Sequence, residues 1–484
     1  MLCFAVFFPI LTGILLFLIP DGHRRIRNCL AEAVSLLTSA MVFYLIFKGQ
    51  GTANDAFPIA ENLLIRFSLD GTGTVFAGLA AFLWPLATLY AFEYMHHEGG
   101  ERPFFALYII SFGVTLGIAL ADNLVTMYIF YEFLSLSTLP MVMHGSSEEA
   151  QRAGFQYMMF TFGGAALALV GVIPAVVWGG NTFSPGGALE AALFETNPAL
   201  MQVLFLCMTL GFGVKAAMFP FHSWLPVAAV APTPVTALLH AAAVVKAGAF
   251  AVIRVCYFTF GAEHMRGTAA QNALLLMASV TIVYGAFRAV REHHLKRRLA
   301  WSTVSNLSYI IMAAALLTRD GMTAAMAHLL FHALIKITLF YCAGAVLVQT
   351  NKTEIESMRG LSKEMPFTSA VYAIAALALA GTPLLPAFVS KWMIGNAAVS
   401  SGNVFGYVGL AAVLIAAVLS ALYVLYPAFF MLFCPADDAD TVQVRREPGL
   451  CMIISMAVLT LAIFACGFFS NSIITFIADA AAQL

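Results

Sequence analysis

Charged side chains are scarce in this sequence: Asp, Glu, Lys and Arg make up 10% of its 484 residues. A soluble domain carries roughly 25% charged residues, so the scarcity excludes an ordinary soluble fold. Hydrophobic residues make up 61% of the chain and the mean hydropathy is +0.89, which places most of it in lipid. The net charge of −1 gives no support to nucleic-acid binding or to an acidic tail.

Metal-binding and nucleotide-binding motifs are also missing. The eight cysteines form no CxxC or CxxH pair, which argues against a metal cluster or a disulfide framework; they are Cys3, Cys29, Cys207, Cys256, Cys342, Cys434, Cys451 and Cys466. No GxGxxG or P-loop stands in a strand-turn-helix context. We therefore expect no cofactor, no metal and no catalytic redox site on this chain. Any redox or energy source must lie in another subunit.

The N-terminus lacks the layout of a cleaved signal peptide. Such a peptide has basic residues before its apolar run and a small-residue cleavage site after it. Here the apolar run MLCFAVFFPILTGILLFLIP precedes the basic stretch DGHRRIRN. We interpret residues 1–20 as a retained first membrane span.

Long apolar runs follow one another along the chain, and each has about the 20 residues that a helix needs to cross a bilayer. Helices are the expected spanning structure because lipid leaves no partner for exposed backbone groups. The sequence therefore predicts an all-α membrane protein with about 14 transmembrane helices. The predicted spans are 1–20, 29–48, 71–92, 103–120, 124–143, 152–178, 200–220, 233–258, 271–290, 298–318, 322–348, 367–397, 404–433 and 449–475.

The Lys and Arg residues are concentrated in every second predicted loop. Loops after odd-numbered spans hold fifteen of them, including the basic run from Arg288 to Arg298, and loops after even-numbered spans hold four. This bias is a positive-inside signal. We expect a multi-pass protein of the inner (cytoplasmic) membrane with both termini on the non-cytoplasmic side. The basic run is interpreted as a cytoplasmic anchor, with a partner-docking patch as the alternative.

Ionisable residues in the middle of a span are costly, and those that remain usually face the bundle interior and carry function. Glu132 stands alone in the apolar run FYEFLSLSTLPMV, and Lys215 stands in LGFGVKAAMFPFHSWLP. Pro220 and Pro226 predict a helix interrupted just after the lysine. Burial disfavours a charged amine and a nearby carboxylate favours it, so movement of Glu132 can switch proton binding at Lys215. A structural ion pair is the alternative.

The next predicted span holds His240 and Lys246. Their spacing of six separates them by about 120° around a helix, so both can face a shared interior. His240 alone is equally compatible with a hydrogen-bonded core histidine. Arg254, nearer the end of the span, is expected to extend its guanidinium towards the membrane surface.

A later span holds His328, His332 and Lys336 at spacings of four in MAHLLFHALIKITLF. This spacing places all three on one stripe of the helix. Two histidines four apart can bind a metal, but no third ligand is evident. A stripe of titratable groups across a span favours a proton relay.

Lys391 lies in AGTPLLPAFVSKW, where Pro383 and Pro386 predict a second interrupted helix. It repeats the pattern at Lys215, a lysine beside a proline-interrupted span. Broken helices are common at ion sites in transporters built from inverted repeats. The two places therefore hint at an internal repeat.

Taken together, these strings resemble the antiporter-like subunits of complex I (NADH:quinone oxidoreductase), group 4 membrane-bound hydrogenases and Mrp-type cation/proton antiporters. The matching strings, in family order over about residues 70–395, are FYEFLSLSTLPMV, GFGVKAAMFPFHSWLP, APTPVTALLHAAAVVKAG, LKRRLAWSTVSNLSY, HLLFHALIKITLF and GTPLLPAFVSKW. The resemblance implies fourteen core helices with two inverted five-helix repeats. It divides the chain into helices 1–3 (1–100), a first repeat (101–260), a second repeat (261–435) and a C-terminal loop and helix (436–484).

The resemblance also implies roles for the first group of residues. Glu132 matches the acid that partners the first channel lysine, and Lys215 matches that lysine. Lys246 matches the central relay lysine, with His240 beside it. One departure is Val227, where many family members carry an acid, so a role for an acid at that loop is in doubt.

The second group carries over in the same way. His328, His332 and Lys336 match the titratable helix that follows, and Lys391 matches the terminal exit position. Lysine there resembles the D-type subunits of Mrp antiporters more than the branch with a terminal Glu. The chain ends soon after its last predicted span, which argues against the complex I subunit that carries a long lateral helix.

Three functions are compatible with these features. The first is a proton-translocating subunit of a multisubunit membrane complex, driven by neighbouring membrane subunits. The second is a Mrp-type component of Na⁺/H⁺ exchange, in which the shortage of hard oxygen ligands places protons on this chain. The third is a self-contained transporter of a small solute, which isolated Lys and His residues along successive helices fit poorly.

Overall fold

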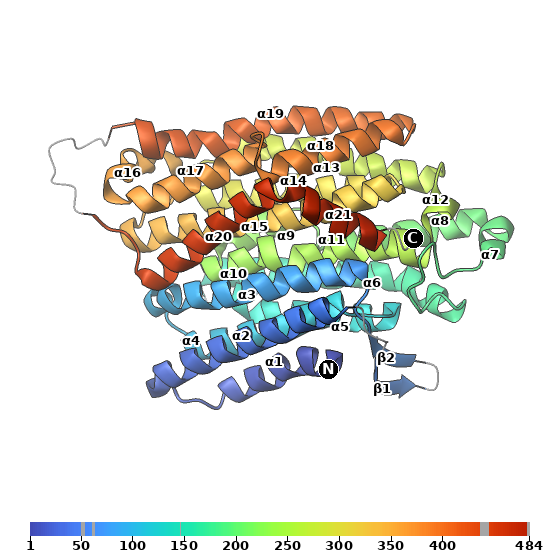
Figure 1. The fold of residues 1–484 in the computed structure, drawn as a ribbon, viewed down its shortest axis with the longest axis horizontal. Coiled ribbons are helices and arrows are strands. Elements are labelled where there is room, and N and C mark those ends of the chain that lie inside the picture. The colour runs from blue at the N-terminus through green and yellow to red at the C-terminus, as the bar shows by residue number, and fades with distance from the viewer. Residues whose placement is uncertain (50–53, 61–62, 146, 436–444, 482–484) are drawn as a thin grey trace.

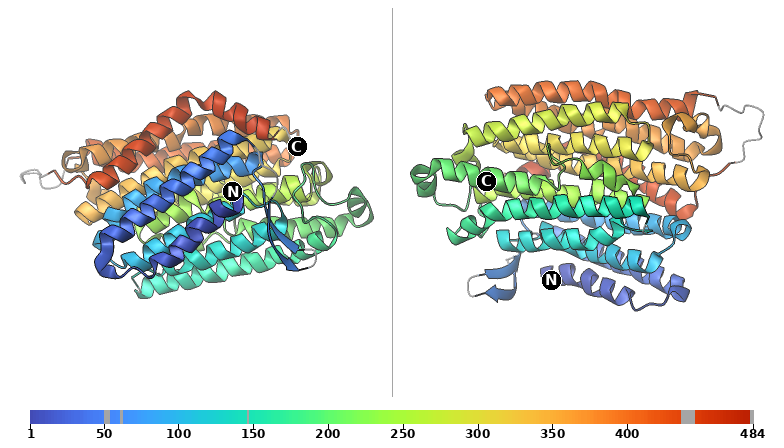
Figure 2. Two further views of the ribbon diagram at one scale, coloured as in Figure 1. Left: turned by 60° about the horizontal axis from the view of Figure 1, so that its bottom comes forward. Right: turned by 180° about the vertical axis from the view of Figure 1, so that it is seen from behind.

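The structure is a computed structural model that describes residues 1–49, 54–60, 63–145, 147–435 and 445–481. It is a bundle whose helices run side by side along one direction (Figures 1 and 2). The N- and C-termini lie at the same end of the bundle, together with β1–β2, α7 and α12 (Figure 1). We call this the terminal end. The link between α1 and α2 and helix α16 lie at the opposite end.

The long helices in the first half of the chain overlap the predicted spans, whereas two short helices, at 191–196 and 224–227, lie outside them. The helices of this half are α1 (Leu2–Leu16), α2 (Arg24–Lys48), α3 (Gly71–Glu98), α4 (Glu101–Ala119), α5 (Leu124–Val142), α6 (Glu148–Val177), α7 (Ala191–Thr196), α8 (Pro198–Gly213), α9 (Trp224–Val227), α10 (Thr233–Ala237) and α11 (Val244–Arg254). Short π-helical segments, Leu238–Ala242 and Val255–Thr259, join α10 to α11 and extend α11. The predicted span 233–258 is therefore helical except at Ala243, and it is not uniformly α-helical.

The second half continues the pattern. Its helices are α12 (Ala262–Met265), α13 (Ala269–Arg291), α14 (Leu295–Ala315), α15 (Arg319–Thr350), α16 (Leu361–Glu364), α17 (Pro366–Ala380), α18 (Pro386–Ser400), α19 (Val404–Phe433), α20 (Leu450–Phe468) and α21 (Ser470–Ala481). The predicted span 367–397 contains both α17 and α18. The range 449–475 contains α20 and the start of α21.

A β-hairpin departs from the all-α prediction. Strand β1 (Asn54–Ala60) pairs antiparallel with β2 (Leu63–Phe67) at the terminal end. Ile65 and Phe67 of β2 are buried, and Phe67 bridges to Ala121 in the link between α4 and α5. The hairpin is held because its alternate apolar side chains pack on the bundle. The two buried positions on β2 make a short alternation, which is a weak strand signal in the sequence.

Side-chain caps define where several helices start. Asp70 accepts a hydrogen bond from the Gly73 amide at the start of α3 (2.7 Å), and Asn123 accepts one from the Thr126 amide at the start of α5 (2.7 Å). Thr318 caps α15 through the Gly321 amide (3.0 Å). Such caps satisfy amides that have no partner within the helix, and all three mark the terminal-end boundary of a long apolar helix.

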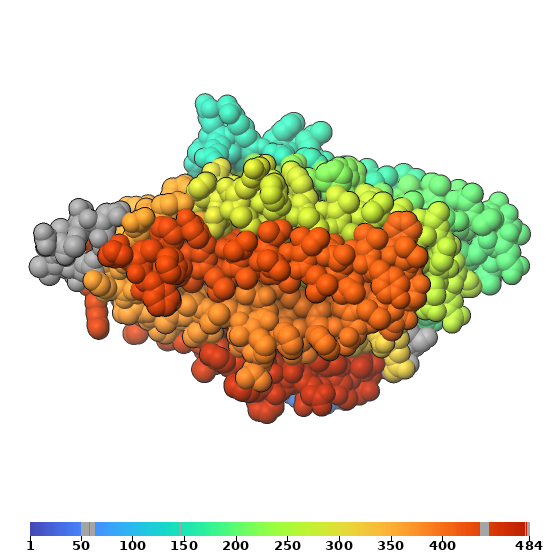
Figure 3. Space-filling view, turned by 90° about the horizontal axis from the view of Figure 1, so that it is seen from above, coloured from blue at the N-terminus to red at the C-terminus, as the bar shows by residue number. Residues whose placement is uncertain are grey.

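Helix α15 lies at the centre of the bundle. It packs against α3, α10, α14, α17, α18, α20 and α21, and its side chains are buried from Gly321 to Val346 except at Leu330. On the face shown in Figure 3, α19 lies across the bundle beside α13. Ten helices of the described chain are long and apolar enough to cross a membrane. The protein is therefore a multi-pass membrane protein in which His328, His332 and Lys336 of α15 are enclosed.

Candidate functional site

Glu132 on α5 and Lys215 face each other inside the first half of the bundle. Lys215 Nζ lies 4.0 Å from Glu132 Oε1. The lysine is fully buried and the Glu132 side chain is 24% exposed. Within the described residues Glu132 Oε1 has no hydrogen-bond partner. The two groups therefore form an ion pair without a direct hydrogen bond.

Tyr131 holds the lysine more closely than Glu132 does. Lys215 Nζ donates to the Tyr131 carbonyl and lies 3.3 Å from the centre of the Tyr131 ring. The Tyr131 hydroxyl in turn donates to the Phe212 carbonyl on α8 (3.1 Å). A cation over an aromatic face is stabilised electrostatically, so Tyr131 gives the ammonium a partner even when Glu132 is distant.

The helix interruption at Lys215 is set by its neighbours. Helix α8 ends at Gly213, before the lysine and not after it as predicted, so Lys215 lies in the interruption itself. Pro220 lies within the interruption and Pro226 within the short α9. Gly248 of α11 packs on this segment: a Cβ there would lie 2.6 Å from the Ala216 amide nitrogen. The absence of a side chain at Gly248 lets α11 approach the break.

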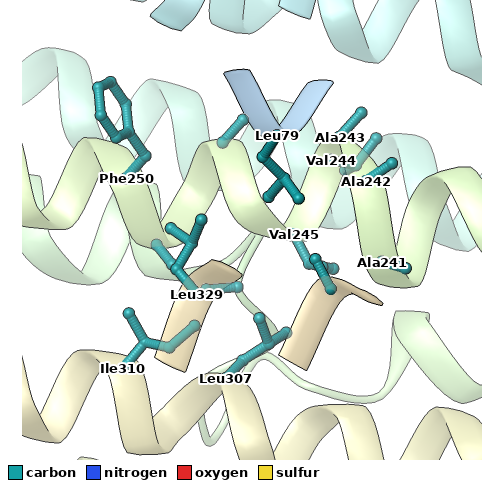
Figure 4. Close-up of a cluster of buried hydrophobic side chains, with 14 of the residues drawn as sticks. Leu79, Ala241, Ala242, Ala243, Val244, Val245, Phe250, Leu307, Ile310 and Leu329 are labelled. Atoms are coloured by element: carbon teal, nitrogen blue, oxygen red, sulfur yellow. The ribbon is translucent and has the colours of Figure 1, made fainter. Parts of the chain in front are cut away.

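His240 and Lys246 lie on either side of a backbone irregularity. His240 belongs to the π-helical segment and stacks on Phe340 of α15, with ring centres 4.8 Å apart. Neither of its ring nitrogens has a hydrogen-bond partner in the described chain. A π turn changes the rotation per residue, so the predicted angle of about 120° does not apply. The side chains from Ala241 to Val245, between the two residues, belong to a cluster of buried apolar side chains that includes Leu79, Leu307 and Leu329 (Figure 4).

A connected row of polar groups runs from Lys246 across α15 to α18. Lys246 Nζ lies 2.5 Å from His332 Nδ1. The His332 ring stacks on His328 (5.7 Å between centres), which stacks in turn on Tyr309 (5.3 Å). His328 Nδ1 lies 2.9 Å from the Ser390 hydroxyl. This row brings together three of the predicted residues and ends beside Lys391 in the sequence.

Lys336 points elsewhere. Its Nζ donates to the Leu299 carbonyl on α14 (2.8 Å) and to the Ser302 hydroxyl, and it lies 6.0 Å from the Phe340 ring. The predicted stripe is therefore divided: His328 and His332 join Lys246, whereas Lys336 faces α14. The Phe340 ring lies between Lys336 and His240, because it also stacks on the histidine.

Lys391 lies in α18, beside the second interruption. Helix α17 ends at Ala380 and α18 begins at Pro386, with Pro383 between them. From α18 the lysine reaches back, and Nζ donates to the carbonyls of Leu379 (2.7 Å) and Ala380 (3.1 Å). Its ammonium thus caps the C-terminus of α17, where the helix dipole is negative.

The sequence did not identify several groups that contact these residues. Tyr131, Ser302 and Ser390 supply direct partners, but hydroxyls of this kind occur throughout the spans and carry no distinguishing pattern. Ser390 could have been noted only because it precedes Lys391. Near Val227, Glu149 and Glu292 line the same cavity of about 510 Å³, so acids are present at that loop although position 227 is not one.

The prediction for Arg254 is wrong. Its side chain is 1% exposed and forms a two-point ion pair with Asp70, with Nη2 2.8 Å from Oδ1. The rings of Phe183, Phe250 and Phe258 surround the guanidinium at about 5 Å. The arginine stays inside because the partly exposed Asp70 carboxylate and three aromatic faces replace the membrane surface as its partner.

Comparisons with known proteins agree with this geometry. The chain is 31% identical over 510 aligned residues to a Na(+)/H(+) antiporter protein of Alkalihalophilus pseudofirmus, an A-type component, in an alignment that covers 99% of this chain and 62% of that protein. It is 31% identical over 394 residues to a probable K(+)/H(+) antiporter protein of Rhizobium meliloti, an A/B-type component, covering 80% of this chain and 38% of that protein. The chain thus spans less than two thirds of the length of these relatives. The relatives include an A-type antiporter subunit, whereas Lys391 suggested a resemblance to the D-type subunits.

A solved structure shares the fold over nearly the whole chain. A chain of the Mrp complex from Dietzia sp. DQ12-45-1b superposes with a TM-score of 0.85 at 25% identity, covering 99% of this chain and 52% of that one. The family model "NADH:quinone oxidoreductase/Mrp antiporter, TM" matches residues 121–420. This range includes the eight ionisable residues proposed from the sequence for proton translocation: Glu132, Lys215, His240, Lys246, His328, His332, Lys336 and Lys391. The chain belongs to the NADH:quinone oxidoreductase/Mrp antiporter transmembrane family.

Proposed function

We propose that this chain is a proton-translocating, antiporter-like subunit of a multisubunit membrane complex. The observation that carries the proposal is the buried row of polar groups that runs from Lys246 on α11, through His332 and His328 on the central helix α15, to Ser390 on α18. Buried ionisable residues in a membrane protein mark ion pathways by default. A hydrogen-bonded amine and imidazole, such as Lys246 and His332, can pass a proton because each can both accept and release one. The stacked His332 and His328 rings would need a water molecule to join them.

In the proposed path a proton enters near Glu132 and Lys215, and passes Lys246. It continues through the histidines of α15 and leaves by way of Lys391. His240 and Lys336 adjust proton binding at Lys246 from the side, because each interacts electrostatically with that lysine. No residue is assigned a catalytic role, because proton transfer along these groups makes or breaks no other covalent bond.

The Glu132–Lys215 pair is proposed as the switch. Two unit charges 4 Å apart interact by about 4 kcal/mol at an effective dielectric constant of 20. The pair sits at 4.0 Å, so a displacement of Glu132 by a neighbouring subunit changes the stability of the ammonium by a large fraction of that energy. The energy source is therefore proposed to lie in a partner protein of the complex, acting through charge movement.

We further propose fourteen membrane crossings, with α17 and α18 forming one interrupted crossing, and two inverted five-helix repeats at 101–260 and 261–435. The count is supported because every predicted span contains a helix. Both termini also lie at the same end of the bundle, which requires an even number of crossings (Figure 1). The C-terminal unit begins at 436, although residues 436–444 lie outside the described chain. The positive-inside bias places the termini on the non-cytoplasmic side of the inner membrane.

For the parent assembly we propose a Mrp-type cation/proton antiporter, because the matched relatives carry the names of Na⁺/H⁺ and K⁺/H⁺ antiporter subunits. A redox-driven complex I-like or hydrogenase-like pump is the alternative within the same family. In either case the relay on this chain carries protons, and any exchanged cation crosses elsewhere in the complex. Identification of the subunits that co-purify with the chain separates the two.

The experiment compares Glu132→Ala and Lys215→Ala with the unmodified chain in everted membrane vesicles that hold the assembled complex. Proton movement, followed by quenching of a pH-sensitive dye, should fall at least tenfold in both variants. Assembly is checked by the yield of co-purified subunits. Unchanged proton movement in normally assembled complex would contradict the proposal. Solute transport by the purified chain alone would favour a self-contained transporter.

A further inference from the structure

Helix α17 is held at both ends by charged side chains from outside it. At its C-terminus, Lys391 of α18 donates to the carbonyls of Leu379 and Ala380. At its N-terminus, the carboxylate of Glu447 accepts hydrogen bonds from the first residues of the helix. The charges match the dipole of a helix, which is positive at the N-terminus and negative at the C-terminus.

The Glu447 contacts are specific. Oε1 accepts from the Phe367 amide (2.6 Å) and more weakly from the Thr368 amide (3.3 Å), and Oε2 accepts from the Thr368 hydroxyl (2.7 Å). The amides at the start of a helix have no partner within the helix. Glu447, in the segment before α20, therefore accepts the amide hydrogen bonds that the N-cap residue of a helix usually accepts.

The segment that carries Glu447 is itself fixed at both sides. The Arg446 amide donates to the Glu364 carbonyl at the end of α16 (2.9 Å). The Gly449 amide donates to the carboxylate of Glu93 at the end of α3. Residues 446–449 thus tie α3 and α16 to the start of α17, and the position of Glu447 is set by three separate elements.

Lys391 has no ion-pair partner among the described residues. Its ammonium contacts backbone carbonyls and, at 3.4 Å, the Ser420 hydroxyl. Its negative counterpart is therefore the C-terminal end of α17 itself. Whatever changes the charge balance or the position of α17 changes how well that end stabilises the ammonium.

We propose that Glu447 is a positioning residue for proton binding at Lys391, acting along α17. The carboxylate fixes the N-terminal end of the helix, and its negative charge favours the protonated lysine at the other end. This inference rests on the proposed proton path and adds to it a group more than fifty residues away in the sequence. It makes the segment before α20 part of the exit step.

The size of the effect follows from the length of the helix. Fifteen residues rise by about 22 Å. At that separation and an effective dielectric constant of 20, loss of the Glu447 charge lowers the proton affinity of Lys391 by about half a pH unit. A cap with a purely structural role would instead lower the transport rate equally at every pH.

The test measures proton movement against pH in everted vesicles with the assembled complex. Lys391→Arg tests whether proton release from Lys391 is needed, because arginine does not release its proton in this range; proton movement should fall at least tenfold. Glu447→Gln keeps acceptors for the amides but removes the charge. It should move the profile about half a pH unit towards lower pH, with the maximal rate within about twofold of the unmodified chain.

The matched control is Glu148→Gln, which removes an exposed carboxylate from the first turn of another helix, α6, and touches neither α17 nor the segment that carries Glu447. It should leave the profile in place. A Glu447→Gln profile that coincides with the unmodified one, while Lys391→Arg abolishes proton movement, would overturn the inference alone, as would an equal shift in Glu148→Gln. If Lys391→Arg leaves the profile unchanged, the exit role of Lys391 fails, and the inference fails with it.

Discussion

The Nζ atom of Lys246 lies 2.5 Å from Nδ1 of His332, although 86 residues separate the two in the sequence. The contact joins α11, which also packs against the break at Lys215, to the central helix α15. It therefore stands between the two interrupted helices. The proposed path depends on this contact more than on any other pair.

Replacement of His332 by Ala should lower proton movement at least tenfold, because Lys246 loses its partner on α15. Lys246→Ala should have a similar effect. The double variant should be no worse than either single one, since residues in one network are not additive. His97→Ala, at the exposed end of α3, is the control. Additive losses in the double variant would show that the two residues act separately.

The Tyr131 ring offers a second test, independent of Glu132. Tyr131→Phe keeps the ring face under Lys215 and removes only the hydroxyl bond to Phe212. Tyr131→Leu removes the aromatic face, which is worth about 1–2 kcal/mol to a desolvated cation. We expect proton movement within about twofold of normal for Phe and about tenfold lower for Leu. Equal rates in the two variants would show that the ring face does not stabilise the ammonium.

The long helices were predictable because each is an apolar run of membrane-spanning length, and that signal is local. The ranges of α3, α5, α13 and α15 follow from it to within a few residues. The candidate residues were predictable for a related reason: a Lys or Glu is conspicuous in an apolar run. The sequence therefore shows that Lys246 and His332 are unusual residues for the middle of a membrane span.

Which of these residues meet was not predictable. His328 and His332 join Lys246, but Lys336 turns to α14, because the contacts of α15 with its surrounding helices decide where each side chain points. The π-helical segment at His240 changes the rotation that a regular helix would give. Arg254 is buried because Asp70, 184 residues away, reaches it. Such contacts depend on tertiary packing and leave no local pattern.

Gly248 tests whether close approach of α11 keeps the break at Lys215 in place. In Gly248→Ala the new Cβ would lie 2.6 Å from the Ala216 amide nitrogen and 2.9 Å from Lys215 Cβ. Overpacking of this kind costs about 1–3 kcal/mol, so the thermal midpoint of the purified complex should fall by several degrees and proton movement should decline. Gly163→Ala is the control, because nothing lies within 4 Å of a Cβ there. Equal midpoints for the two variants would contradict the prediction.

The Asp70–Arg254 pair should matter for stability. Asp70 caps α3 through the Gly73 amide and also pairs with Arg254, which is 1% exposed. Asp70→Asn keeps an oxygen for the cap but leaves the guanidinium without its counter-charge. Loss of one partner of a buried pair costs roughly 3–5 kcal/mol, and because the Asp70 side chain is 31% exposed we expect the lower end of that range. Thermal unfolding in detergent measures it.

Glu148→Gln is the matched control for Asp70→Asn. Glu148 pairs with Arg152 at 3.5 Å, but both side chains are more than 80% exposed. An exposed pair of this kind contributes little because solvent screens it, so the control should unfold at the same temperature as the unmodified chain. The difference between the two variants isolates the effect of burial. Should Asp70→Asn unfold as late as the control, the aromatic rings around Arg254 would suffice to hold the buried guanidinium.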